Sequence, residues 1–373
     1  MSNITLEVNG IKYEGWTDIS VSKSIESLCG QFSFSTTVKE NAELVIQNDL
    51  KLQDKAVVFI DDIKVITGYI ENLYIDYDVD NHLITVEGRD KTGDLVDSSI
   101  KPQNYKHRSF VSLVENVLSD NGYTNIKVIN QVKNLPNIVE PQQSATVSET
   151  IMQFLDKYAK KVQALMITDA DGNILITRES PAFSIGSLIS DNTPSTNILG
   201  ASINLNSTDR FRFNYIESQG DNSTYTKQSV KQTGVSTDKD IRGPRRNYTI
   251  MRPATQEVTL NQLAIWTANL RKAKGTRYNC RVQDYYSSKV FNQLWEINTL
   301  VQVEDIRCQL SGQFLIQGAK YSKSLSGSFT EISIVNKGAF DLESLVASNN
   351  DFGDKLVNKT GSGESVIDAL EAI

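Results

Sequence analysis

A run of short strand-like segments between residues 57 and 97 constrains the fold of this chain more than any other feature. Apolar and polar residues alternate along it, and it ends in the turn Gly88-Arg89-Asp90-Lys91-Thr92 and an apolar Leu95-Val96 step. Alternation with period two is typical of antiparallel strands that bury one face. A looser form of the pattern recurs at residues 300–338. Two related β units with few catalytic side chains predict a role in assembly rather than in chemistry.

The two units are compared most directly through their first strands. Residues 57–63 (VVFIDDI) resemble residues 300–306 (LVQVEDI), and each segment is followed by a glycine-bearing strand, a polar turn and a last strand. We interpret this as an internal duplication. A coincidental likeness between two β meanders is the alternative, because the match has no strict period.

Composition excludes several classes of protein. The 373-residue chain is long enough for two or three domains, and its net charge of −7 disfavours a binder of nucleic acid or of anionic membranes. No apolar run has the length of a membrane span, and we expect no signal peptide, because the first residues read directly into a strand pattern. Three widely spaced cysteines and two histidines form neither a disulfide framework nor a zinc pattern. We therefore expect a reducing compartment, no cofactor and no metal.

Proline placement suggests the domain map. All seven prolines lie between Pro102 and Pro253, and central strands exclude proline. We expect a mainly β protein in which two similar antiparallel β-barrel domains flank a small α+β module. The expected divisions are a first barrel at 1–99, an α+β domain at 100–182, a second barrel at 183–340 with a polar loop (218–250) and a helix (259–274), and a flexible C-terminal tail at 341–373.

The α+β module has recognisable helix and turn signals. Apolar residues at helical spacing follow Ser109, which predicts an N-cap there and a helix end at Gly122. A second helix is predicted to open at Thr146-Val147-Ser148-Glu149, a capping-box sequence. Asp171-Gly172 lies between two short apolar runs and predicts a hairpin.

Several motifs allow both a functional and a structural interpretation. Asp169-Ala170-Asp171-Gly172-Asn173 begins like a calcium loop, but its glycine comes too early, so a hairpin is the better interpretation. The basic cluster Arg242–Arg246 fits either an acidic partner or a solvated loop tip, which we favour. Tyr285 and Tyr286, with Trp295 nearby, fit equally an interface cluster or the core of the second β unit.

No residues are predicted to be catalytic or to bind a metal. Arg89 and Asp90 directly follow a strand, and we expect this pair to lock the closure of the barrel or to make a subunit contact. Near the C-terminus, Val366, Ile367 and Leu370 form a short apolar stripe beyond a Gly-Ser-Gly linker. A stripe this short does not hold a helix alone in water, so we expect it either to dock on a partner or to be disordered.

A set of motifs along the chain resembles the baseplate hub proteins of Mu-like contractile-tailed phages. The resemblance covers about residues 1–340, and Trp16 within its first motif becomes a candidate for a structural or subunit contact. The motifs are Gly15-Trp16-Thr17, Ser24-Ile25-Glu26-Ser27, Gly30-Gln31-Phe32, Gly68-Tyr69-Ile70, Gly88 to Asp97, and Ser148-Glu149-Thr150.

The resemblance implies a structural protein of the virion tail baseplate, assembled in the host bacterial cytoplasm. Such hubs are homotrimeric rings with two similar β-barrels per chain, and their pseudo-sixfold symmetry joins the tail tube to a threefold central spike. Related type VI secretion spike proteins fuse the hub to their needle, whereas here the spike would be a separate protein. Expected partners are a second copy of the chain, the spike, tube or other baseplate proteins and a tape measure protein, with no membrane and no specific nucleic acid. A tail-associated cell-wall hydrolase or a carbohydrate-binding tail module is the alternative.

Overall fold

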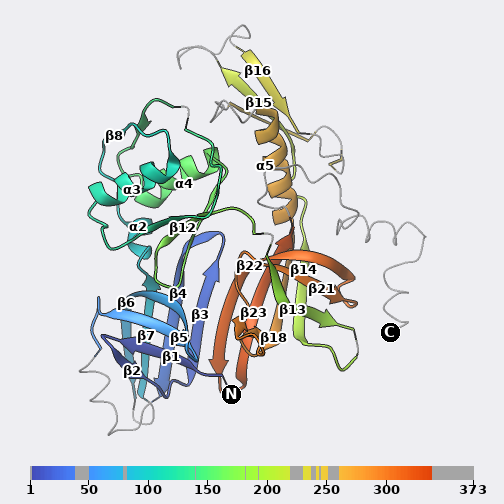
Figure 1. Ribbon diagram of the computed structural model, residues 1–373. Coiled ribbons are helices and arrows are strands. Elements are labelled where there is room, and N and C mark those ends of the chain that lie inside the picture. The colour runs from blue at the N-terminus through green and yellow to red at the C-terminus, as the bar shows by residue number, and fades with distance from the viewer. Residues whose placement is uncertain are drawn as a thin grey trace, which may run out of the picture.

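The computed structural model describes most of the chain between residues 2 and 337. The described ranges are 2–37, 50–78, 82–138, 140–180, 182–191, 193–218, 230–236, 241–242, 245–250 and 260–337. The predicted tail at 341–373, with Val366, Ile367 and Leu370, lies outside the described residues. The described chain is mainly β, as the alternating pattern predicted, and its layers are shown in Figure 1.

The N-terminal part forms a set of antiparallel strands that we call the first β-unit. Strand order is β3-β4-β7-β6-β5-β1-β2, so the meander at residues 57–97 lies at its centre. Side chains alternate between core and solvent along β4 and β5, as expected for a sheet with one wet face. Its strands are β1 (Ile4–Val8), β2 (Ile11–Tyr13), β3 (Asp18–Ser24), β4 (Ser27–Thr37), β5 (Lys55–Ile60), β6 (Ile63–Tyr77) and β7 (His82–Asp90).

The C-terminal part forms the second β-unit. Its strand order is β14-β18-β23-β22-β21-β13, in which only the β13·β21 pair is parallel. The strands are β13 (Phe183–Ser190), β14 (Ile198–Leu205), β18 (Thr276–Gln283), β21 (Leu300–Asp305), β22 (Leu310–Ser324) and β23 (Gly327–Asn336), with a separate small hairpin of β19 (Tyr286–Ser288) and β20 (Gln293–Leu294).

The two β-units have the same central pairing. In the first, β5, β6, β7, β4 and β3 follow one another across the sheet; in the second, β21, β22, β23, β18 and β14 do so. The long strands β6 and β22 are both 15 residues long, and each has a bulge against its partner, at Ile70/Asn72 and at Ile316/Gly318. Matching these bulges equates β6 with β22, which supports the duplication.

The units are joined edge to edge rather than closed separately. Strand β3 pairs antiparallel with β22 over six residue pairs from Lys323↔Ile19 to Gly318↔Ser24, and this seam makes one 13-stranded sheet. Among the described residues the strand order is an open path without a closed ring of hydrogen-bonded strands. The predicted pair of separate barrels is therefore not seen, and the two units are parts of one continuous sheet. The reason is that the outer edge of β3 pairs with β22 and does not close its own unit.

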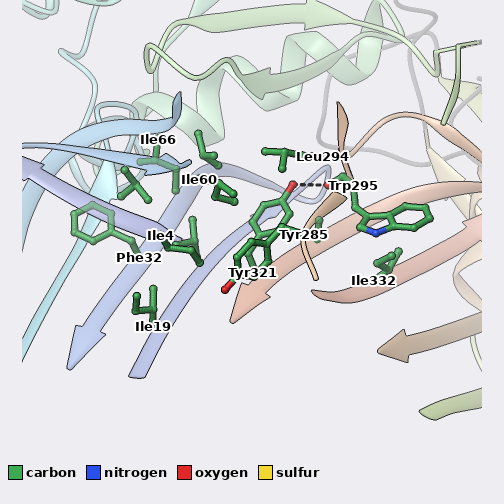
Figure 2. Packing of buried hydrophobic residues seen from close by; sticks show 14 of the residues in the cluster. Ile4, Ile19, Phe32, Ile60, Ile66, Tyr285, Leu294, Trp295, Tyr321 and Ile332 are labelled. Carbon is green, nitrogen blue, oxygen red and sulfur yellow. Dashed lines mark hydrogen bonds between the residues drawn. The ribbon is translucent and has the colours of Figure 1, made fainter. Parts of the chain in front are cut away.

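A single hydrophobic core lies across the seam. Figure 2 shows side chains of both units in one cluster, with Ile4, Ile19 and Phe32 of the first unit on one side and Tyr285, Tyr321 and Trp295 of the second on the other. The Tyr321 hydroxyl donates a hydrogen bond to the backbone carbonyl of Trp295. Tyr285 and Trp295 are buried, which supports the core interpretation of these aromatics.

The α+β module packs above the first β-unit and has its own core (Figure 1). Ser109 caps the first long helix, since its side chain accepts a hydrogen bond from the Ser112 amide, and Gly122 follows the helix with a positive φ. The hairpin at Asp171-Gly172 is also confirmed. Its elements are α2 (Gly93–Asp97), β8 (Asn104–Tyr105), α3 (Phe110–Asp120), β9 (Val128–Asn130), β10 (Gln143–Ser144), α4 (Ile151–Lys161), β11 (Leu165–Thr168) and β12 (Ile174–Thr177).

The predicted start of the second helix was wrong by one turn. The capping box is formed by Thr150 and Gln153, whose side chains and backbone amides bond reciprocally, and α4 begins at Ile151. Thr146 and Glu149 close a separate turn, and Ser148 has a φ of 70° that no helix accommodates. Val147 is consequently 76% exposed rather than on the apolar face of the helix.

The predicted polar loop at 218–250 was partly wrong. Strands β15 (Arg212–Ser218), β16 (Val230–Val235) and β17 (Arg246–Ile250) form a small sheet that packs on α5 (Leu260–Lys274), so the predicted helix is present. Residues between these strands lie partly outside the described chain. Arg245 of the basic cluster donates to the backbone carbonyls of Ser207 and Thr208 and stacks 4.8 Å over the Phe211 ring, which ties it to the neighbouring loop.

Candidate functional site

The sequence candidates Arg89 and Asp90 lie at the end of β7, where three parts of the chain meet. Neighbouring residues of a strand point to opposite faces of a sheet. Asp90 accordingly points into the protein, whereas Arg89 points to the polar face. The two do not pair with each other, so the expected Arg–Asp lock is replaced by two separate sets of contacts.

Asp90 is buried and fully used as a hydrogen-bond acceptor. Its Oδ1 accepts from the amide and the hydroxyl of Thr92 at 2.9 and 2.6 Å. Its Oδ2 accepts from the Gly30 amide at 2.7 Å and from the Thr168 hydroxyl at 2.8 Å. Burial raises the pKa of the Asp90 carboxyl despite these bonds. The carboxylate thereby joins β7, β4 and β11 of the α+β module.

Lys23 completes the same junction from strand β3. Its Nζ donates to the Thr168 carbonyl at 3.0 Å. Desolvation lowers the pKa of the Lys23 ammonium, and attraction to Asp90, Glu296 and Asp169 opposes that change. Because Asp90, Lys23 and Thr168 are bonded to one another or to other parts of the same chain, the junction is suited to holding domains together rather than to proton transfer on a substrate.

The hairpin β11–β12 docks on the first β-unit through its turn. Lys64 pairs with Asp171 at 2.7 Å, and the Thr67 hydroxyl donates to the Ala170 carbonyl at 2.8 Å. Gly172 allows this approach, since a Cβ there would lie 2.7 Å from the Thr67 carbonyl oxygen and its φ is +72°. Asp169 accepts from the amides of Asp171 and Asn173, which supports the hairpin interpretation of this sequence over a calcium loop.

Arg89 bridges two carboxylates on the polar face. It donates to Glu71 through Nε at 2.6 Å and through one terminal nitrogen at 3.0 Å, and it also pairs with Asp97 of α2. The Arg89 guanidinium lowers the pKa of the Asp97 carboxyl. The bidentate contact with Glu71 joins β7 to β6, and the contact with Asp97 joins β7 to α2.

Trp16 is part of the core of the first β-unit. The ring is 4% exposed, packs edge-on against Phe34 at 5.5 Å, and donates from Nε1 to the Tyr13 carbonyl at 3.1 Å. The sequence suggested either a structural role or a subunit contact for Trp16 and Asp90. Both side chains are buried within one chain, which favours the structural role. Their contribution to subunit contacts stays a prediction.

The surface features that sequence reasoning missed lie on two strand edges. Among the described residues, β14 pairs only with β18, so the outer edge of this strand faces no other strand. The segment of β6 beyond its pairing with β5 likewise has one unpaired edge in the described chain. Ile75 on β6 and Leu205 on β14 are 39% and 49% exposed. Period-two alternation predicts Ile75 on the buried face, and only the pairing pattern shows that no strand of the described chain lies on that edge.

The described residues contain neither a metal-binding cluster nor a membrane-spanning helix. No group of three or more histidine, cysteine, aspartate or glutamate side chains there is arranged to hold a metal ion. The helices in the described ranges include none that is long and apolar enough to cross a bilayer.

Comparisons with known proteins agree with this architecture. Residues 3–90 match a family model described as Mu phage baseplate assembly protein GpP-like, N-terminal, and residues 92–178 match baseplate hub protein gp44-like, second domain. Baseplate hub protein gp44 of Escherichia phage Mu is 25% identical over 314 residues, which cover 82% of this chain and 79% of that protein.

Solved structures with the same fold span nearly the whole chain. The 43 kDa tail protein of prophage MuSo2 from Shewanella oneidensis is 27% identical with a TM-score of 0.76, covering 91% of this chain and 99% of that one. A tail protein of Neisseria meningitidis MC58 has a TM-score of 0.77 at 18% identity, with 92% and 99% covered, and shows the fold alone. Residues 3–178 therefore carry the first two domains of Mu-like baseplate hub proteins, and over most of its length the chain is similar to the hub protein gp44 of phage Mu and to the MuSo2 tail protein.

Proposed function

We propose that this baseplate hub protein works as a homotrimeric ring with pseudo-sixfold symmetry that joins the tail tube to the central spike. Each chain supplies two β-units, so three chains supply six quasi-equivalent units. Partners in the proposed assembly are the spike, tube or other baseplate proteins, and a tape measure protein. The ring would assemble in the host cytoplasm before it enters the virion tail.

One observation carries this proposal: the two β-units of one chain share their central pairing order and meet edge to edge at the β3·β22 seam. A subunit that presents the same unit twice is suited to link a sixfold partner to a threefold one. The domain divisions at 1–99, 100–182 and 183–340 belong to the same proposal, with the α+β module held on the first unit through Asp90 and Lys23.

We further propose that the chain has no hydrolytic activity. The polar groups at the Asp90 junction are bound to one another. A glycosidase needs two carboxylates placed on either side of its substrate, one of them with a raised pKa. Asp90 has a raised pKa, but all of its hydrogen bonds are internal and it is buried.

Light scattering coupled to gel filtration tests the ring, and zymography on peptidoglycan tests the enzymatic alternative. The proposal predicts a trimer and no clearing. A monomer at every concentration counts against the ring. A clearing band that survives repurification and is lost on substitution of one carboxylate overturns the structural role.

A further inference from the structure

The seam inside the chain indicates where a second seam forms between chains. Strand β3 is an end strand of the first β-unit, and its outer edge pairs with the distal part of β22. The equivalent end strand of the second unit is β14, and the equivalent of β22 is β6. Among the described residues, neither β14 nor the distal part of β6 has a strand on the corresponding edge.

The registers of the paired strands define the equivalence residue by residue. Across the first unit the partners run Ile70↔Gly88, Gly88↔Phe32 and Phe32↔Val21. Starting from the equivalent bulge, Ile316↔Ile334, Ile334↔Tyr278 and Tyr278↔Ile203 run across the second unit. Val21 on β3 therefore corresponds to Ile203 on β14.

The same alignment places the partner residue. Five positions beyond Ile70 lies Ile75 on β6, and five beyond Ile316 lies Tyr321 on β22. In the intrachain seam Tyr321 lies opposite Val21. Its counterpart would put Ile75 opposite Ile203, a pair of apolar β-branched side chains.

Side chains at the intrachain seam are more buried than their counterparts on β14 and β6, as expected if those two edges lack a neighbouring strand. Val21 and Tyr321 are buried by each other's strand, whereas Ile203 is half-buried and Ile75 is exposed. Strand β14, with the sequence ILGASINL, carries no charge and no proline. Edge strands are normally protected by charges, proline or a cover, so an unprotected edge of this length is expected to be covered in the assembled protein.

We infer that β14 of one copy pairs antiparallel with residues 72–76 of β6 in the next copy, with Ile203 opposite Ile75, Asn204 opposite Tyr74 and Leu205 opposite Leu73. This inference rests on the proposed trimer and specifies the contact that builds it. The interface is heterologous, because a different edge is used on each side, and repetition of such a contact gives a ring when the rotation closes. Backbone hydrogen bonds across the pair provide recognition by strand addition.

Disulfide trapping tests the register. Adjacent pairs of an antiparallel ladder alternate between close and wide spacing, so two variants are made, Ile75→Cys/Ile203→Cys and Tyr74→Cys/Asn204→Cys. The register control is Ile75→Cys/Leu205→Cys, which is displaced by two residues. Each cysteine is also made alone, and the unsubstituted chain reports any background from Cys29, Cys280 and Cys308. Mild oxidation with copper phenanthroline is followed by non-reducing electrophoresis, and thermal melting checks that each variant is folded.

The inference predicts covalent dimers and trimers for at least one in-register pair, several-fold more than for the displaced pair and none beyond background for single cysteines. Single-cysteine dimers would mean a twofold contact and would overturn it. A protein that is trimeric by light scattering but does not cross-link in register also overturns this seam while leaving the proposed ring intact. A chain that is monomeric under all conditions refutes the proposed ring and the seam together.

Discussion

Val21 on β3 lies directly opposite Tyr321 on β22, and both side chains are buried, at 0% and 3% exposure. The two residues are 300 positions apart in the sequence, yet they unite the two β-units in one core. Because the two side chains meet at the seam itself, the pair is a direct test of whether the seam stabilises the fold.

We expect Val21→Ala to lower the free energy of unfolding by about 2 kcal/mol, because it removes buried methyl groups and leaves a cavity. Val147→Ala is the matched control: the same substitution at a 76% exposed position should change stability by less than about 0.5 kcal/mol. Urea denaturation followed by fluorescence compares the two. Equal effects would contradict a packed seam.

The buried carboxylate Asp90 and the exposed carboxylate Asp97 are expected to respond oppositely to pH. The folded-state pKa of Asp90 is raised, so its favourable contribution is present below the unfolded pKa and is lost as pH rises through the folded value. The pKa of Asp97 is lowered by Arg89, so its contribution is present above the unfolded pKa and is lost as pH falls.

The measurement compares each asparagine variant with the parent chain. The stability of the parent relative to Asp90→Asn should decrease as pH rises above about 4, whereas its stability relative to Asp97→Asn should decrease as pH falls below about 4. Chemical denaturation at several pH values gives both differences. If both stability differences changed with pH in the same direction, the environment described for Asp90 or for Asp97 would be contradicted.

Gly68 is required where β6 passes close to β7. A Cβ at this position would lie 1.8 Å from the Arg89 carbonyl oxygen, so Gly68→Ala must displace backbone and should cost more than about 2 kcal/mol. Gly200 on β14 has no atom within 4 Å of an added Cβ, and Gly200→Ala should leave folding unchanged. Melting temperatures of the two variants decide the point, and a tolerated Gly68→Ala would contradict the close crossing.

The start of α4 can be tested through its cap. Thr150→Ala should cost about 1 kcal/mol, because the helix loses its N-cap, whereas Thr146→Ala should have a smaller effect on the helix itself. Circular dichroism during thermal unfolding measures both. A larger loss for Thr146→Ala would restore the helix start that the sequence first suggested.

Local signals in the sequence predicted local structure well. Ser109, Gly122 and the Asp171-Gly172 turn act within a few residues, and each has the predicted role. The cap at Thr146 failed because Thr146-x-x-Glu149 and Thr150-x-x-Gln153 have the same signature four residues apart, and only the positive φ of Ser148 separates them.

Long-range pairing was beyond the reach of the sequence pattern. The sequence indicated the duplication, but it aligned Val57 with Leu300, which is displaced by two residues. When the bulges of β6 and β22 are matched, Tyr69 corresponds to Leu315. Their strand partners, Lys55 and Leu300, are therefore the equivalent residues. A period of two allows such a displacement without changing which face is apolar. The role of Arg89 and Asp90 on opposite faces depends on contacts with Glu71 and Thr168, which no local pattern specifies.

The mass of the purified particle tests the central claim most directly. A homotrimer of this 41.6 kDa chain has a mass of about 125 kDa, three times that of the chain. Native mass spectrometry or sedimentation across a wide range of protein concentration measures it. The account predicts a trimer that becomes dominant as concentration rises, and a chain that stays monomeric, or that forms only dimers, would contradict it.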